Sequence, residues 1–175
     1  MNSRKRYAGI SLPGLFIRRM DGMKTLLPVL TIIVLLFAVD AYAFHCEVTT
    51  TPVSFGAYDV FSSFSLDTTG RISVSCNNPE KKRMPVTISI SRGAANSFSP
   101  RQMRRIGGSD RMDYYLFVDA SRTAVWGDGT GGSSTYVGMI DRTSPLNVPI
   151  YGRIPARQNL RAGSYQDILV VTIDW

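Results

Sequence analysis

The C-terminal stretch, residues 151–175, constrains the fold more than any other part of this chain, because it ends in a continuous run of strand formers (ILVVTI, residues 168–173). β-Branched and aromatic side chains fit the pleated, half-buried surface of a sheet. At the two-residue period of a strand, one face carries Leu169, Val171, Ile173 and Trp175. A strand at a sheet edge leaves N–H and C=O groups that can pair with another chain. We therefore expect these four residues to bind a partner.

The N-terminal part has the features of an export signal. An apolar run at residues 26–39 follows Lys24, and the small-x-small tripeptide at 41–43 is typical of a signal-peptidase site. The run has about fourteen residues, whereas a membrane-spanning helix needs about twenty. We predict that residues 1–43 are a signal peptide and that the protein passes through the periplasm to the cell surface or the extracellular space.

Removal of this leader leaves residues 44–175 as one domain, large enough to bury a core. Translation can also begin at Met20 or Met23 without loss of the signal. The whole chain carries a net charge of +7, but residues 44–175 hold fourteen basic and eleven acidic side chains. This nearly balanced charge gives no indication of nucleic acid as a partner.

Two cysteines, Cys46 and Cys76, are the only ones in the chain. In an exported protein they most simply form a disulfide, which closes a loop of about thirty residues. A metal site needs more ligands than two thiols and the single histidine, His45. The same shortage of histidine leaves no base for a hydrolytic triad. We expect no metal, no cofactor and no catalytic residue.

Short segments of period-two alternation, separated by turn residues, occupy residues 44–175, and no segment has the period of a helix. We interpret residues 91–110 as a long loop or irregular edge, and residues 67–70, 77–83 and 127–134 as turns. This pattern predicts an all-β sandwich of six or seven strands. The expected strands are residues 46–55 with a kink at Pro52, 71–76, 85–91, 113–119, 136–140, 146–150 and 164–175.

Several fragments resemble enzyme sites only superficially. The glycine-rich residues 127–132 lack the Gly-Lys-Ser/Thr ending of a phosphate loop, so a hairpin turn is the better interpretation. Asp119 and Asp128 are too few for a calcium site without the spacing of an EF-hand. Asp67 belongs to a predicted turn and gives no indication of catalysis.

Two groups of side chains can bind a surface glycan, although solvated loops and core packing explain them more simply. The basic group consists of two separate clusters, Lys81, Lys82 and Arg83 and then Arg101, Arg104 and Arg105; the aromatic group is Tyr58, Phe61, Phe64 and Trp126.

Four longer segments make the chain recognisable. They are CEVTTTPVSFGAYDVFS (46–62), GRISVSC (70–76), DYYLFVDASRTAVWGDGTGGSS (113–134) and VPIYGRIPARQNLRAGSYQDILVVTIDW (148–175). With them the chain resembles the spore coat protein U domain family, the subunits of archaic chaperone–usher pili and related secreted coats. Tyr-Gly-x-Ile-Pro followed by Ala-Gly-x-Tyr-x-Asp is the most specific part of the resemblance.

The resemblance implies an incomplete immunoglobulin-like β-sandwich that lacks its final strand. A periplasmic chaperone fills the resulting groove with its own strand, and the next subunit replaces that strand at an outer-membrane usher. The family also pairs the two cysteines that match Cys46 and Cys76. Its acceptor groove runs beside the terminal strand, which agrees with the partner-binding face of Leu169, Val171, Ile173 and Trp175.

One departure from the family concerns the donor segment. Polymerising subunits carry alternating apolar residues before the first cysteine, whereas only Phe44 and His45 stand between the predicted cleavage site and Cys46. Two residues span at most about 7 Å, too little to pair along a strand. We expect a terminal (tip) subunit or a coat protein that does not polymerise. The alternative is an autonomous, secreted, lectin-like module that uses loops 92–112 and 127–134.

Overall fold

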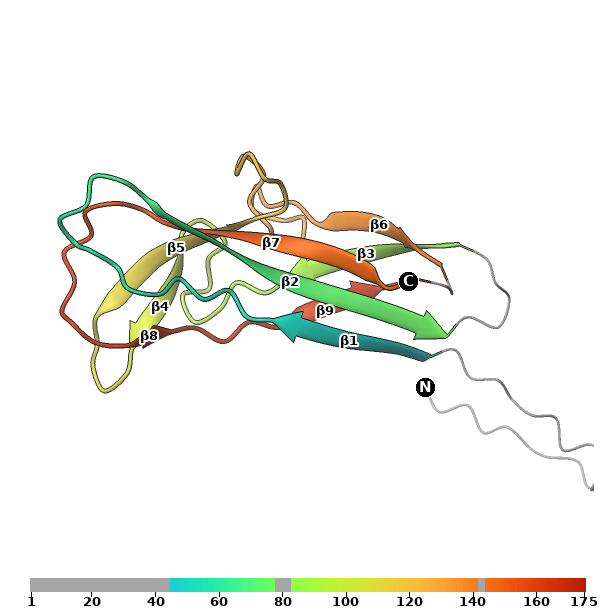
Figure 1. Cartoon of the computed structure of the whole chain (residues 1–175), viewed down its shortest axis with the longest axis horizontal. Helices are drawn as coiled ribbons and strands as arrows, with labels where there is room; N and C mark the ends of the chain where they lie inside the picture. The colour runs from blue at the N-terminus through green and yellow to red at the C-terminus, as the bar shows by residue number, and fades with distance from the viewer. Residues whose placement is uncertain (1–44, 78–82, 142–143) are drawn as a thin grey trace, which may run out of the picture. The chain divides into compact units, whose positions relative to one another are not determined.

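The computed structural model describes residues 45–77, 83–141 and 144–175, and every regular element in these ranges is a β-strand (Figure 1). The predicted signal peptide and most of the predicted turn at 77–83 lie outside the described residues. None of the described residues belongs to a helix long and apolar enough to cross a membrane.

Two antiparallel sheets make up the fold. The larger sheet has the strand order β1-β2-β7-β5-β4-β8, and the smaller one has the order β6-β3-β9. Both β1 and β9 therefore lie at a sheet edge. The strands are β1 (His45–Thr51), β2 (Leu66–Asn77), β3 (Met84–Ile90), β4 (Arg101–Arg105), β5 (Arg111–Phe117), β6 (Tyr136–Ile140), β7 (Leu146–Ile154), β8 (Tyr165–Gln166) and β9 (Val171–Asp174).

The core lies between the sheets and follows the alternation in the sequence. On β2, Ile72 and Val74 have no exposed surface, and their neighbours in sequence point outward. On β3 the same pattern buries Val86, Ile88 and Ile90. These two strands confirm the expected all-β sandwich, because a period of two places alternate side chains on one face.

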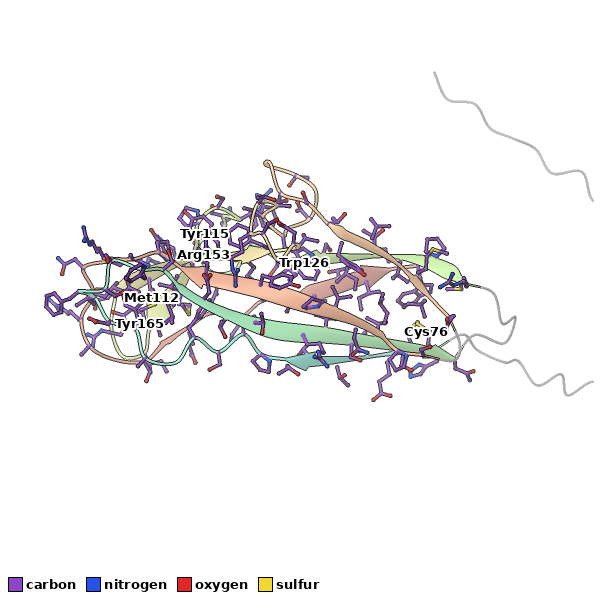
Figure 2. The ribbon with its side chains drawn as sticks, turned by 45° about the horizontal axis from the view of Figure 1, so that its top comes forward. Cys76, Met112, Tyr115, Trp126, Arg153 and Tyr165 are labelled. Carbon is purple, nitrogen blue, oxygen red and sulfur yellow. A yellow bond between two sulfur atoms is a disulfide. The ribbon has the colours of Figure 1, made fainter. Side chains whose placement is uncertain are left out.

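Trp126 belongs to this core and not to a surface that could bind sugar. Its side chain is fully buried, and its indole Nε1–H donates a 3.0 Å hydrogen bond to the carbonyl of Ile88 (Figure 2). A buried tryptophan needs a partner for its N–H, and the carbonyl on β3 supplies it.

The predicted loop at 91–110 was wrong in part, because it contains β4. The strand begins at Arg101, whose side chain is fully buried despite its charge. The guanidinium donates hydrogen bonds to the carbonyls of Ile90, Ser91 and Trp126, and it lies over the ring of Phe98. The strand begins in a polar stretch because Nε and one terminal nitrogen of the buried guanidinium donate to main-chain oxygens of other segments, whereas the second terminal nitrogen, Nη1, has no hydrogen-bond partner.

The predicted turn at 67–70 was also wrong, because β2 begins at Leu66. This first half of β2 pairs with β7, and Asp67 lies opposite Arg153. The two side chains form a bidentate ion pair with distances of 2.7 and 2.8 Å. Gly70 allows the end of β1 and the residues after it to approach, because a Cβ atom there would lie 2.8 Å from both the Thr51 carbonyl oxygen and the Val53 side chain.

The predicted terminal strand is two strands in different sheets. β8 pairs with β4 in the larger sheet, and β9 pairs with β3 in the smaller one. Residues 167–170, here called the crossing segment, connect them. This division and the additional strand β4 raise the number of described strands to nine.

Candidate functional site

The candidate site is a groove of about 530 Å³ between the edge strands of the two sheets. Among the described residues, β1 pairs only with β2, and β9 pairs only with β3. One wall comes from β1 and the residues after it, and the other from residues 165–171; the floor includes Tyr114, Leu116 and Ile150. We call this feature the edge groove.

Apolar side chains that point inward remain partly exposed along the edge groove. Val48 on β1 lies opposite Val74, so both side chains are on the inner face of the sheet. Val74 has no exposed surface, whereas Val48 is 43% exposed. Leu169 and Val171 line the opposite wall and are half-buried. The inner faces are therefore well covered in the middle of the sandwich and poorly covered at this edge.

The main chain of β9 also points toward the edge groove. Val170 accepts a 2.9 Å hydrogen bond from the Ser91 N–H and donates one to the Ser91 hydroxyl, so its polar groups face β3. Successive strand residues direct their N–H and C=O groups to opposite edges. Leu169, Val171 and Ile173 therefore direct theirs to the open edge while their side chains pack against the core.

Trp175 differs from the other three predicted partner-binding residues. It lies past the end of β9, and its side chain is 61% exposed. Of the four, Leu169 and Val171 line the edge groove, Ile173 packs against the core without lining the groove, and the inward alternation stops before Trp175.

Asp167 anchors the crossing segment, a role that the sequence did not indicate. Its carboxylate accepts three hydrogen bonds, from the Tyr114 hydroxyl at 2.7 Å, the Ala94 N–H at 3.1 Å and the Ile168 N–H at 2.9 Å. Burial and the bond to Asp167 raise the pKa of Tyr114 far above its usual value. Gly93 packs so closely that a Cβ atom there would overlap the carboxylate. This aspartate ends the Ala-Gly-x-Tyr-x-Asp motif, which was the available indication of its importance.

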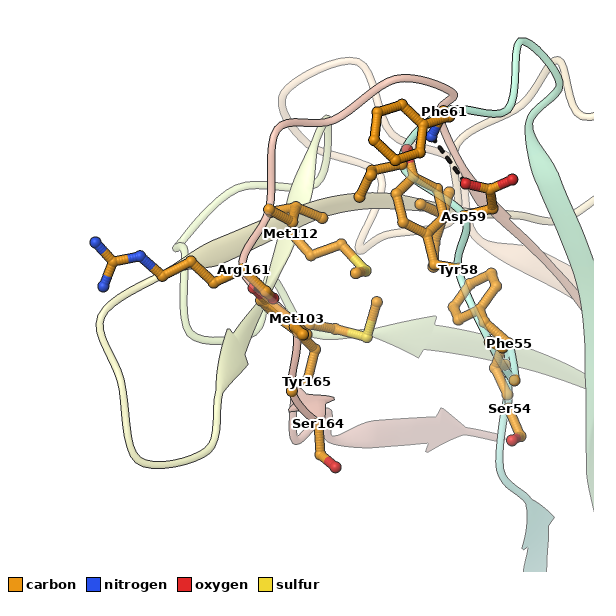
Figure 3. A pocket seen from close by; sticks show the side chains of 18 of the residues that line it. Ser54, Phe55, Tyr58, Asp59, Phe61, Met103, Met112, Arg161, Ser164 and Tyr165 are labelled. Carbon is orange, nitrogen blue, oxygen red and sulfur yellow. Dashed lines mark hydrogen bonds between the residues drawn. The ribbon is translucent and has the colours of Figure 1, made fainter.

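A second pocket, of about 820 Å³, continues the edge groove (Figure 3). Met103 and Met112 extend into it, between the wall of residues 52–61 and the wall of residues 160–165. We call it the methionine pocket. Met112 and Tyr165 lie near the end of the sandwich that is remote from Cys76 (Figure 2).

The expected disulfide is present and ties β1 to the rest of its sheet. Cys46 and Cys76 lie directly opposite each other on β1 and β2. The bond therefore fixes one wall of the edge groove at the end where β1 begins.

The structure describes one of the two predicted basic clusters in full, and its three arginines do not form one exposed patch. Arg101 is buried, Arg104 is exposed, and Arg105 forms a 2.9 Å ion pair with Asp110. In the other cluster, Arg83 is exposed just before β3, and Lys81 and Lys82 lie outside the described residues. Of the aromatic group, Tyr58 is half-buried, whereas Phe61 and Phe64 are 89% and 81% exposed.

The carboxylates considered for calcium make local hydrogen bonds instead. Asp119 accepts bonds from Ser121, Thr123 and Ala124, which hold its pKa well below the usual range, the Ser121 bond contributing most. Asp128 accepts bonds from the hydroxyl and N–H of Thr130. Across residues 45–77, 83–141 and 144–175, no group of three or more potential ligands could hold a metal ion.

The two sheets and their open edge define an immunoglobulin-like β-sandwich. The chain belongs to the spore coat protein U family, since the model of the Spore Coat Protein U domain matches residues 32–172. Protein U of Myxococcus xanthus is 32% identical over 132 residues, which cover 69% of this chain and 70% of that protein. Membership of this family places the chain among structural proteins and not among enzymes.

Two similar solved structures are of pilus proteins, and the first of them shows the same fold. One is the chaperone–tip adhesion subunit pre-assembly complex CsuC–CsuE from archaic chaperone–usher Csu pili of Acinetobacter baumannii. The match has a TM-score of 0.55 and 17% identity, and it covers 76% of this chain but only 40% of the other. The minor tip subunit HdaB of the E. coli Hda pilus has a TM-score of 0.40 and 12% identity, with coverages of 73% and 79%.

Proposed function

We propose that this protein is an exported subunit that is assembled by donor-strand complementation into a surface pilus or coat. A periplasmic chaperone first supplies a strand to the edge groove, and a neighbouring subunit replaces that strand at an outer-membrane usher. The observation that carries the proposal is the pair of open strand edges on one apolar groove. An added strand there gains main-chain hydrogen bonds to β9 and apolar contacts for its alternate side chains.

Family membership supports the same function. Protein U shares about a third of its residues with this chain over the matched region, and the fold is that of the tip adhesion subunit of the Csu pili. That subunit forms a complex with a chaperone, so a chaperone is the first partner to test for this chain.

We also propose that cleavage after Ala43 releases residues 44–175 and that the subunit accepts a strand without donating one. β1 begins at His45, so a protein cleaved there enters the sheet almost at once. Such a subunit fits the tip of a fibre or a coat that does not polymerise. The N-terminal sequence of the exported protein tests the cleavage site.

The full chain is expressed for export with and without its cognate chaperone, and the yield of soluble, disulfide-bonded protein is measured. We expect a yield that depends on the chaperone and recovery as a one-to-one complex. A stable, cooperatively folded monomer made without any chaperone would overturn the proposal and favour the autonomous lectin-like module.

Two neighbouring substitutions locate the binding surface. Leu169→Asp puts a charge into the wall of the edge groove, so we expect the chaperone complex to be lost. Ile168→Asp changes a side chain that is 82% exposed, so the complex should be retained. Equal yields of complex for the two variants would show that the strand binds elsewhere.

A further inference from the structure

We propose that the strand that fills the edge groove carries an aromatic side chain at the position facing the methionine pocket. This inference rests on the proposed function, because it specifies the chemistry of the donor strand.

The methionine pocket is continuous with the edge groove. Val53, Phe55 and Met103 line both, and Tyr165 does so from the opposite wall. Phe55, Met103 and Tyr165, which line both cavities, are labelled in Figure 3, so an extended strand along the edge groove can continue into the methionine pocket.

The interior of the methionine pocket suits an apolar group. Met103, Met112 and Ile154 contribute aliphatic and thioether surface. The hydroxyl of Tyr58 donates a 2.7 Å bond to the Pro155 carbonyl and accepts one of 2.9 Å from the Gln158 N–H. Because the Tyr58 hydroxyl in this wall already has hydrogen-bond partners, a polar side chain on the donor strand would lose its hydration with little compensation.

The other wall tyrosine has a partner as well. The Tyr165 hydroxyl donates a 2.8 Å bond to the carbonyl of Arg161, which is the main chain of its own segment. Of the buried side-chain nitrogen and oxygen atoms in the described part of the chain, those without a hydrogen-bond partner belong to Arg101 and Arg122, and neither residue lines this pocket. The polar side chains that do line it, Ser54, Asp59, Arg161 and Ser164, are all exposed. The buried part of the pocket therefore selects the side chain of the donor strand by shape and apolar contact.

An aromatic ring fits this pocket better than a branched aliphatic side chain. The pocket, at about 820 Å³, has room for a ring. Methionine side chains are flexible and make favourable contacts between sulfur and aromatic rings. Phe55, Tyr58 and Tyr165 add ring edges and faces for aromatic pairing.

The position of the aromatic residue follows from the wall that both cavities share. Tyr165 lies beside the methionine pocket, whereas Leu169 and Val171 lie beside the edge groove. In an extended donor, the aromatic residue should stand about four to six positions from the apolar residue facing Leu169 or Val171.

The test uses the full chain with a donor strand fused after Trp175 through a short flexible linker. The reference donor alternates valine and threonine. In one fusion a phenylalanine replaces the inward valine at the methionine pocket, and in a second it replaces the valine facing Val171. After export, each protein is unfolded in urea. We expect phenylalanine at the methionine pocket to raise the folding equilibrium constant about tenfold over the reference, and the second phenylalanine not to do so.

In the Met103→Ala variant, the donor with phenylalanine at the methionine pocket should give the same folding equilibrium constant as the valine–threonine donor. Met139→Ala is the matched control, because Met139 lies on β6 and does not line either cavity. The gain should persist in that control.

The outcomes separate the two proposals. If the valine–threonine donor stabilises the chain but phenylalanine gives the same increase at both positions, the aromatic preference is wrong and the proposed function stands. If no donor stabilises the chain relative to the linker alone, the proposed function fails.

Discussion

The hydroxyl of Tyr114 donates a 2.7 Å hydrogen bond to the carboxylate of Asp167. This bond joins the buried face of β5, in the larger sheet, to the segment that carries the chain into the smaller sheet. It therefore fixes the position from which β9 starts and the direction of one wall of the edge groove.

Tyr114→Phe should lower the free energy of unfolding by about 1.5–3 kcal/mol, because a carboxylate loses a buried hydrogen-bond donor. Tyr114 is only 3% exposed, so water replaces the lost hydroxyl poorly. Tyr115→Phe is the control, because Tyr115 is less buried and stacks on Phe117, with ring centroids 6.0 Å apart. Urea unfolding of the donor-fused full chain measures both. Equal losses would mean that the bond to Asp167 contributes little.

Arg101→Lys should destabilise the sandwich strongly although it retains the charge. The guanidinium bonds three carbonyl oxygens from two segments, and an ammonium on a different stem cannot reproduce this planar arrangement. We expect a loss of about 2–4 kcal/mol in the free energy of unfolding. Arg104→Lys, at an exposed position on the same strand, should be nearly neutral. A neutral Arg101→Lys variant would contradict this role.

Replacement of both Cys46 and Cys76 by alanine should cost about 3–4 kcal/mol, as the chain-entropy model gives for a closed loop of this length. Because β1 is a wall of the edge groove, the variant should also give less chaperone complex. Thermal unfolding of the oxidised, the reduced and the double-alanine protein measures the effect. If reduction left the midpoint unchanged, the disulfide would not stabilise β1.

The strands with regular alternation could be predicted from the sequence. Ile72, Val74, Val86 and Ile88 stand two positions apart on segments that pair along much of their length, so local pattern and final burial agree. The same period placed Leu169, Val171 and Ile173 on one face. The side-chain direction of these residues depends mainly on the alternation within their own strand, so a local pattern is sufficient to predict it.

The remaining features depend on contacts between distant segments. Tyr114 and Asp167 are 53 residues apart, so no local pattern indicates that the terminal stretch changes sheets there. The polar residues around Arg101 predicted a loop because the carbonyls that accept hydrogen bonds from the guanidinium come from other segments. The methionine pocket likewise combines Met103 and Met112 with two remote stretches, and each methionine alone is compatible with any core.

Asp67 should make the stability of the sandwich depend on pH below about 4. The hydrogen bond from Arg153, and then the charge of Arg122, lower its pKa in the folded protein below 3.8, the value assigned to an unperturbed aspartate. A carboxylate with a lowered folded pKa stabilises the protein above its unfolded pKa, and this contribution disappears as the pH falls through the folded value. Because the side chain is 34% exposed, solvent screening limits the contribution to about 0.5–1 kcal/mol.

Asp67→Asn should therefore unfold at lower urea than the unchanged protein at pH 7, and the gap should close as the pH approaches 2. Urea midpoints at pH 7, 5, 3 and 2, for both proteins fused to the same donor strand, measure this gap. Glu47→Gln, an exposed carboxylate on β1, serves as the control for general loss of negative charge. A protonated Asp67 has no charge left to attract Arg153. If the gap between the urea midpoints stayed constant down to pH 2, the lower stability of Asp67→Asn would therefore come from the packing of the asparagine.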